Sequence, residues 1–120
     1  RCQVPASVEY VSGLRHAVVR YCRANCSDDD RVCEDVAVAV NEACTNVVRH
    51  AYREQVGTLD LEATAVNGGL VVVVSDSGVG VHAPTDDPGS GFGLQLMAAL
   101  SRLRLHSVGQ GTRVEMRFGC

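Results

Sequence analysis

The sequence predicts a two-layer α/β sandwich, in which helices cover one face of a mostly antiparallel sheet. Residues 58–65 and 112–118 alternate between apolar and polar side chains, which is typical of strands with one buried and one solvated face. Residues 31–51 carry apolar side chains at helical spacing. Glycine-containing segments at 67–69 and 109–111 predict hairpin turns between neighbouring strands.

The N-terminal half predicts one short strand and two helices. Residues 1–4 are expected to form an edge strand, and Ser7 is a candidate N-cap for a helix over residues 7–24. The polar loop 25–30 carries aspartates at the start of a second helix, where the helix dipole favours negative charge. That second helix is expected over residues 31–51.

The C-terminal half predicts two hairpins with a loop and a helix between them. The second strand of the first hairpin is more apolar than the first strand, so we expect it near the centre of the sheet. The predicted elements are strands 58–65 and 70–75, a loop over 81–88, a helix over 92–100, and strands 103–107 and 112–118.

The length and composition favour a single domain over residues 1–120 with one modest core. The net charge is −3, so the composition gives no basic surface for nucleic acid. No apolar run is long enough to span a bilayer, and the N-terminus has no signal-peptide pattern. The first residue is Arg1 rather than Met, which we interpret as a trimmed chain or a domain excised from a longer regulator.

The helix predicted over residues 31–51 has two distinct sides at 3.6 residues per turn. Its apolar side holds Val36, Val40, Ala43, Cys44, Val47, Val48 and Ala51. Its polar side holds Glu42, Asn46, Arg49, His50 and Arg53. Glu42, Asn46 and His50 are four residues apart in turn, so they stack along one edge of the helix.

Three separated motifs follow one another in the chain. They are Asn41-Glu42-Ala43-Cys44-Thr45-Asn46-Val47-Val48-Arg49-His50-Ala51-Tyr52, then Asp76-Ser77-Gly78-Val79-Gly80, then Gly89-Ser90-Gly91-Phe92-Gly93-Leu94. Each motif alone is a weak signal. Together they place an acid and an amide on a helix, an Asp at a strand end, and a glycine-rich loop at a helix start, which is a pattern that describes a nucleotide site.

The three motifs resemble the N, G1 and G2 boxes of the GHKL ATPases, the superfamily of gyrase, heat-shock chaperones, histidine kinases and MutL. The small size and the pattern Glu-Ala-x-Thr-Asn-x-x-x-His-Ala-Tyr resemble the anti-sigma-factor serine kinases of bacterial stress and sporulation switches. The resemblance covers nearly the whole chain. It implies a Bergerat-type ATP-binding fold, which agrees with the two-layer sandwich predicted from the patterning.

The resemblance implies that Glu42 is the general base and Asn46 the Mg²⁺ ligand. A carboxylate one helical turn from a metal ligand can orient a substrate hydroxyl or a water. An amide oxygen suits a hard cation that keeps several waters and shares phosphate oxygens. The alternatives are a solvated helix glutamate and a polar surface asparagine.

Asp76 is the candidate reader of the adenine base, because it follows a buried strand and its carboxylate can accept a hydrogen bond from the adenine amino group. Gly78 and Gly80 allow the backbone to approach the base closely. The alternative for Asp76 is the first residue of a β-turn. By resemblance Thr112 supports the Asp76 carboxylate, and the alternative of a plain strand threonine stays open.

Gly89, Gly91 and Gly93 are the candidate phosphate loop, because free N–H groups at the start of the next helix can bind a polyphosphate. Phe92 belongs to this loop, although its side chain fits the helix core better than a ligand contact. The alternative is a merely flexible loop.

The loop before the third motif departs from the family because it contains no Lys or Arg, and Ser90 stands where family kinases often place an arginine. Charge on a transferring phosphoryl group needs a cation besides Mg²⁺. Arg49 or an arginine of a partner could supply it, although Arg49 could equally be a solvated surface residue. His50 fits a packing and capping role near the helix end better than catalysis.

These assignments predict a cytoplasmic, ATP- and Mg²⁺-dependent anti-sigma factor. It would act as a serine/threonine kinase on an anti-anti-sigma protein, bind a sigma factor, form a homodimer, and contact neither nucleic acid nor a membrane. One alternative is a kinase-inactive protein-binding module that holds ATP. The chain could also be the kinase domain of a fused phosphatase or antagonist regulator or, less favoured, a histidine-kinase catalytic domain.

The chain has six cysteines but no Cys-x-x-Cys pair. An ATP site implies the cytosol, where thiols are kept reduced. Cys22, Cys26 and Cys33 are expected near one another at a corner between two helices. We interpret them as small hydrophobic residues, with a zinc or redox role as the alternative.

Overall fold

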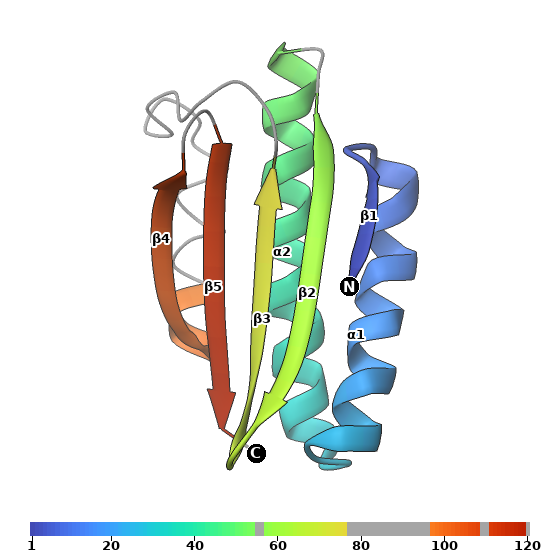
Figure 1. Ribbon diagram of the computed structural model, residues 1–120. Helices are drawn as coiled ribbons and strands as arrows, with labels where there is room; N and C mark the ends of the chain where they lie inside the picture. The colour runs from blue at the N-terminus through green and yellow to red at the C-terminus, as the bar shows by residue number, and fades with distance from the viewer. Residues whose placement is uncertain (55–56, 77–96, 109–110, 120) are drawn as a thin grey trace.

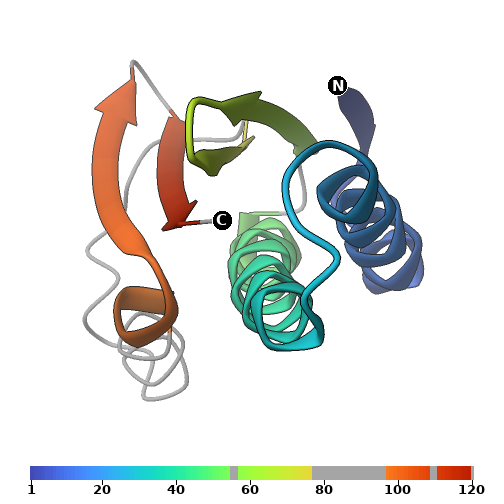
Figure 2. The same cartoon turned by 90° about the horizontal axis from the view of Figure 1, so that it is seen from below.

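The computed structural model describes residues 1–54, 57–76, 97–108 and 111–119. These residues contain a five-stranded sheet in the order β1-β2-β3-β5-β4, and every neighbouring pair of strands is antiparallel. The described helices all lie on one face of this sheet (Figures 1 and 2). The predicted two-layer α/β sandwich is therefore confirmed.

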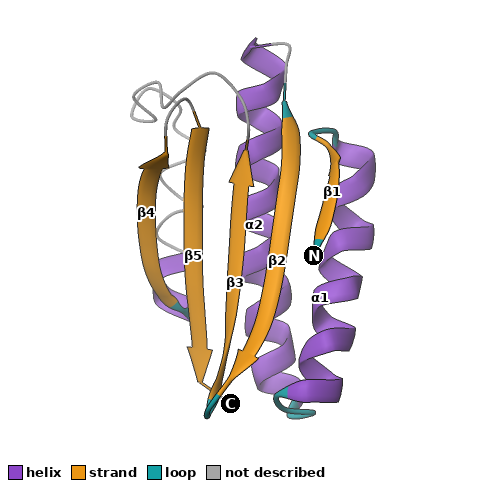
Figure 3. Cartoon of the chain, in the orientation of Figure 1, coloured by secondary structure: helices purple, strands orange, loops and turns teal. Residues whose placement is uncertain are grey.

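Every predicted strand is present, and the first two predicted helices are present with shifted ends (Figure 3). The elements are β1 (Cys2–Pro5), the 3-10 turn η1 (Val8–Tyr10), α1 (Val11–Asn25), α2 (Asp30–Glu54), β2 (Thr58–Val66), β3 (Gly69–Asp76), β4 (Arg102–Val108) and β5 (Gly111–Gly119). Residues 97–100 are also helical, as predicted for the end of the helix over 92–100.

The first helix begins later than predicted, and Ser7 does not cap it. Ser7 precedes the 3-10 turn η1, and its hydroxyl makes no capping bond but donates to Glu9 Oε1 at 3.3 Å. The chain leaves β1 in a tight turn, closed by the Ser7 N–H donating to the carbonyl of Pro5 at 2.8 Å. Because the first turn is wound this tightly, the regular α-helix starts only at Val11.

The start of α2 follows the prediction from charge, and the structure adds a side-chain cap. The Arg31 N–H donates to Asp29 Oδ1 at 2.8 Å, so Asp29 satisfies one of the free N–H groups at the helix start. The helix continues beyond the predicted end to Glu54. Its apolar side is buried as predicted, over Val36, Val40, Ala43, Cys44, Val47 and Val48.

The first hairpin joins β2 to β3 through the predicted Asn67-Gly68 turn. Gly68 has φ +73, a left-handed conformation that glycine adopts without strain. Gly69 begins β3 close to β5, where a Cβ atom would lie 2.6 Å from the carbonyl oxygen of Phe118. Both glycines are therefore required by the local geometry.

The core lies between the helices and the inner face of the sheet. β3 is the middle strand of the five, and its inner residues Leu70, Val72 and Val74 have no exposed surface. The same face of β5 buries Val114, Met116 and Phe118, as its alternating pattern predicts. This packing fixes α2 against the sheet.

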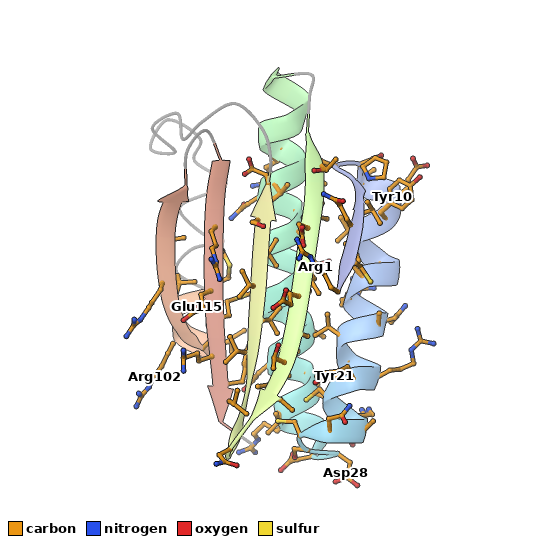
Figure 4. All side chains as sticks on the ribbon, viewed as in Figure 1. Arg1, Tyr10, Tyr21, Asp28, Arg102 and Glu115 are labelled. Atoms are coloured by element: carbon orange, nitrogen blue, oxygen red, sulfur yellow. The ribbon has the colours of Figure 1, made fainter. Side chains whose placement is uncertain are left out.

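Tyr21 on α1 ties the helical layer to the sheet (Figure 4). β1 pairs with β2 only from Thr58 to Leu61, so the backbone of Ala65 lies beyond the end of β1. The Ala65 N–H donates to the Tyr21 hydroxyl oxygen at 3.0 Å. A side chain of α1 therefore completes the hydrogen bonding that the short edge strand leaves open.

We predict that Leu70→Ala lowers the free energy of unfolding by about 2–5 kcal/mol, because it leaves a cavity between β3 and α2. Leu105→Ala is the matched control. Leu105 is 50% exposed, so we expect a change within about 0.5 kcal/mol. Urea denaturation of both variants tests this, and equal losses would contradict the placement of the core.

Candidate functional site

The candidate base and metal ligand both lie on α2, one helical turn apart. Glu42 and Asn46 are half-buried residues of the second half of that helix. This half lies at the same end of the molecule as the carboxyl end of β3, where Asp76 is the last residue (Figure 1). The structure therefore brings the helix of the first motif and the strand of the second motif to one end of the fold.

The orientation of Asn46 follows from the packing of α2 against α1. Asn41 faces α1, because Arg15 Nη1 donates to Asn41 Oδ1 at 3.0 Å. Five residues of α-helix turn by about 140°, so Asn46 points away from α1. α2 stands between α1 and the helical residues 97–100 (Figure 2), so Asn46 lies on the side away from α1.

Asn46 lies at the boundary between the core and solvent. Ala43 and Arg49 are each three residues from Asn46, which places them about 60° to either side of it around the helix. Ala43 has no exposed surface, whereas Arg49 is exposed. The Asn46 side chain therefore lies at the edge of the buried stripe of α2.

The amide oxygen of Asn46 is buried and has no hydrogen-bond partner. Among the residues that the structure describes, no other buried side-chain nitrogen or oxygen lacks a hydrogen-bond partner. A buried acceptor without a donor costs about 1–3 kcal/mol, so such an atom needs an explanation. An unpartnered oxygen at the edge of the core is a suitable ligand for a hard cation such as Mg²⁺.

Sheet register brings together two further candidates that are far apart in the sequence. Ser75 on β3 lies opposite Arg113 on β5. Asp76 is the next residue on one strand and Thr112 the preceding residue on the antiparallel neighbour, so their backbones share one end of the sheet. The support of the Asp76 carboxylate by Thr112 stays a prediction.

The other candidate residues lie outside the described residues. These are Gly78, Gly80, Gly89, Gly91, Phe92 and Gly93. Their assignment to base and phosphate contacts therefore stays a prediction from the sequence. The described part of the candidate site is formed by α2, the end of β3 and the start of β5.

One contact beside the site was missed in the sequence. Asn41 opens the first motif, and its amide oxygen accepts from Arg15, which also donates through Nη2 to Ser12 Oγ at 3.3 Å. This bond holds α2 to α1 one residue before Glu42. Its signal in the sequence was the position of Asn41 between the polar and apolar sides of α2.

The predicted cluster of cysteines is present where α1 meets α2. The thiols of Cys22 and Cys33 are buried and donate to the carbonyl oxygen of Ser27 at 3.8 and 3.5 Å. Burial is the main cause that raises the pKa of Cys22, followed by the proximity of Cys33. Cys26 is disulfide-bonded, so the expectation of reduced thiols is wrong there.

The remaining buried thiol lies inside the first motif. Cys44 has no exposed surface, and burial raises its pKa to about 12. It is therefore a neutral packing residue at physiological pH. No group of three or more His, Cys, Asp or Glu residues that could hold a metal ion occurs among the described residues, and none of the helices described there is long and apolar enough to cross a membrane.

Comparison with known proteins agrees with the fold described above. Residues 4–118 match the family model of the histidine kinase-like ATPase domain. The match covers nearly the whole chain, and the chain therefore belongs to this family. The Bergerat-type fold that the resemblance implied is thereby supported.

The chain is also similar to two bacterial kinases. It is 36% identical over 84 residues to the serine-protein kinase RsbW of Bacillus mycoides (strain KBAB4), which is 69% of this chain and 51% of that protein. It is 37% identical over 78 residues to the serine-protein kinase RsbW of Bacillus thuringiensis (strain Al Hakam), which is 64% of this chain and 48% of that protein. The matched region thus spans about half the length of these relatives.

We predict that Asn46→Leu leaves the free energy of unfolding of the ligand-free chain equal to or above that of the wild type. The substitution removes a buried oxygen without a partner, whose desolvation costs about 1–3 kcal/mol. Thermal unfolding without ligand measures this. A loss of more than about 1 kcal/mol would mean that Asn46 is a structural residue whose amide has a stabilising contact.

Proposed function

We propose that this chain is a cytoplasmic, ATP-binding anti-sigma factor with serine/threonine kinase activity toward an anti-anti-sigma protein, which regulates transcription by partner switching. The observation that supports this most directly is the buried, unpartnered Oδ1 of Asn46, one turn from Glu42. Membership of the histidine kinase-like ATPase family and similarity to serine-protein kinases agree with it.

In this proposal, residues at the end of the sheet recognise the adenine base, and the third motif binds the phosphates. The Asp76 carboxylate accepts a hydrogen bond from the adenine amino group, with Thr112 beside it on the neighbouring strand. Gly78 and Gly80 let the backbone approach the base. The phosphate loop is formed by Gly89, Gly91, Phe92 and Gly93.

Glu42 acts on the nucleophile. Its carboxylate accepts the proton of the substrate serine or threonine hydroxyl while the hydroxyl oxygen bonds to the γ-phosphorus of ATP. The bond from that phosphorus to the bridging oxygen breaks, and ADP leaves with the electron pair. Asn46 Oδ1 would hold Mg²⁺, which when bound neutralises charge on the phosphate oxygens.

Arg49 is the proposed source of the cation that the glycine-rich loop lacks. It lies seven residues after Glu42, which is two turns and about 20° around the helix, so both side chains share one side of α2. Arg49 is exposed and makes no hydrogen bond or ion pair within the described residues. Its guanidinium is therefore available to a phosphate at this end of the fold.

The partners in this proposal are a sigma factor and the anti-anti-sigma protein that is phosphorylated. The homodimer is proposed on the family resemblance. The absence of Lys and Arg from the loop over 81–88 favours a second candidate, a module of the same fold that binds ATP and a partner without transferring phosphate.

We predict that the chain binds ATP with Mg²⁺ in preference to GTP, and that Asp76→Asn weakens ATP binding strongly. The substitution replaces a carboxylate acceptor by an amide that also donates hydrogen bonds. Calorimetric titration with both nucleotides measures this. Equal affinity of the wild type for ATP and GTP would rule out the base-reading role of Asp76.

We predict that Glu42→Gln keeps nucleotide binding but lowers phosphate transfer by roughly 10²–10⁴-fold, the usual contribution of a positioned base. Asn46→Ala should impair both Mg²⁺-dependent nucleotide binding and transfer, because Asn46 contacts the metal. Transfer is measured as radiolabelled phosphate incorporated into candidate antagonist proteins. Binding of the sigma factor is followed by pull-down and should survive Glu42→Gln.

The same assay separates the two candidate functions. If the wild type binds ATP and a partner but transfers no phosphate to any antagonist, the binding module replaces the kinase. Arg49→Ala tests the proposed cation, and Arg31→Ala is its control, because Arg31 is exposed near the opposite end of α2. Equal transfer by the two arginine variants would exclude Arg49 from the site.

A further inference from the structure

On the face of the sheet opposite the helices, β4 and β5 carry four arginines, whereas β2 carries Asp60 and Glu62. No described helix lies on that face (Figure 2). Register places Arg102 opposite Arg117 and Arg104 opposite Glu115, and residues opposite one another point to the same side of the sheet. Arg113 is two residues from Glu115 along β5 and lies on the same side.

We call these four residues, Arg102, Arg104, Arg113 and Arg117, the arginine face. They lie on two neighbouring strands, β4 and β5, and all four are exposed. Strand geometry places them within a strip of about 13 Å by 5 Å. Such a strip on a chain of net charge −3 is a local feature and does not follow from the composition.

Glu115 lies among these arginines, opposite Arg104, and is the carboxylate within the arginine face. Arg117 Nε pairs with Glu115 Oε2 at 3.1 Å. Arg102, Arg104 and Arg113 make no hydrogen bond or ion pair within residues 1–54, 57–76, 97–108 and 111–119. The surface therefore offers three unengaged guanidinium groups beside one that is paired.

Two of the arginines carry like charges at directly opposite positions of neighbouring strands, an arrangement that by itself is repulsive. Arg102 and Arg117 form such a pair, on an edge strand and its neighbour. An anion bound between them would replace this repulsion by charge-assisted hydrogen bonds. Arg117 already pairs with Glu115, so Arg102 is the member of this pair that has no ion-pair partner among the described residues.

The chemistry of the face favours a protein carboxylate over a nucleic acid. Glu115 lies inside the strip and would repel a continuous phosphate backbone, whereas separate carboxylates can avoid it. Val71 and Val73 lie opposite Arg117 and Glu115 on β3 and add an apolar border. A mixed apolar and charged border is typical of protein interfaces.

We propose that the arginine face is a docking surface for an acidic segment of a partner protein. Its carboxylates would pair with Arg102, Arg104 and Arg113, and its apolar residues would contact Val71 and Val73. A helix with carboxylates four residues apart repeats every 6 Å or so, close to the spacing of about 7 Å between alternate residues of a strand. The proposal rests on the sheet alone and does not depend on kinase activity.

The test uses the isotope-labelled full chain and a synthetic helical peptide of about 20 residues built from Glu, Ala and Leu. We expect NMR chemical-shift changes of backbone amides confined to β3, β4 and β5. The affinity for the peptide should decrease as the salt concentration rises from about 0.05 to 0.3 M. A peptide with Gln in place of Glu should not bind. Shifts centred on α1 or α2, or equal binding of the Gln peptide, would overturn the proposal.

Arg102→Glu is the decisive variant because it separates binding from folding. It should weaken peptide binding roughly tenfold through the loss of one charge-assisted contact. Its melting temperature should equal or exceed that of the wild type, because the new carboxylate faces Arg117. Its affinity for ATP should be unchanged. Loss of peptide binding can therefore be told apart from loss of the nucleotide binding on which the proposed function depends.

Arg20→Glu is the matched control, because Arg20 is an exposed arginine on α1 that makes no hydrogen bond or ion pair within the described residues. It should leave peptide affinity within about twofold, since only long-range screened charge changes. Equal loss in both variants would overturn the proposal in favour of unspecific charge. A DNA duplex of equal charge that binds as well, or peptide-independent self-association through these strands, would overturn it in favour of a nucleic acid or a second copy.

Discussion

The candidate site depends on the way that α2 packs on the sheet. Two long helices cover the described sheet, so α2 buries a broad stripe that includes Val36, Val40 and Cys44. Asn46 lies at the edge of this stripe, about 60° from the fully buried Ala43. A rotation of α2 by one residue, about 100°, would carry Asn46 into solvent or into the core. The position of the proposed metal ligand is therefore set by core packing as much as by its own chemistry.

Contacts with α1 fix the same rotation from the other side. The bond from Arg15 to Asn41 and the tie from Tyr21 to Ala65 hold α1 against α2 and β2 respectively. Neither Arg15 nor Tyr21 has a role in nucleotide chemistry in our proposal. Their effect is to limit how α2 can turn or slide, which is what a site built on a helix edge requires.

The sequence was sufficient for elements in which local and tertiary preferences agree. The alternating pattern of β5 and the Asn67-Gly68 turn encode their structures within a few residues, because strand faces and left-handed turns have strong local requirements. Ser7 was wrong as a cap because the turn after β1, and not the residue type, decides how the helix starts. Helix ends and entry turns depend on what the neighbouring strand does, and that information is tertiary.

In the candidate site, too, some features follow from local sequence and others depend on tertiary contacts. Helical periodicity alone gives the relation between Glu42 and Asn46, since both lie on one element. The burial of Asn46 Oδ1 without a partner was not predictable, because periodicity gives the side of the helix but not whether the amide finds a donor. The adjacency of Asp76 and Thr112 requires β5, and not β4, to pair with β3. Patterning predicts the last hairpin but does not say which of its strands enters the middle of the sheet.

The two faces of β5 bear on whether a partner and a nucleotide would influence each other. Its inner side chains Val114, Met116 and Phe118 are buried, its outer side carries Arg113 and Arg117, and Thr112 lies near its start. Coupling between two sites requires an element with two arrangements that both ligands bias. β5 is paired on both sides and its inner face is packed, so a second arrangement would have to break the core. An acidic partner on the arginine face and a nucleotide at the end of the sheet would therefore bind independently, unless the partner also reaches α2.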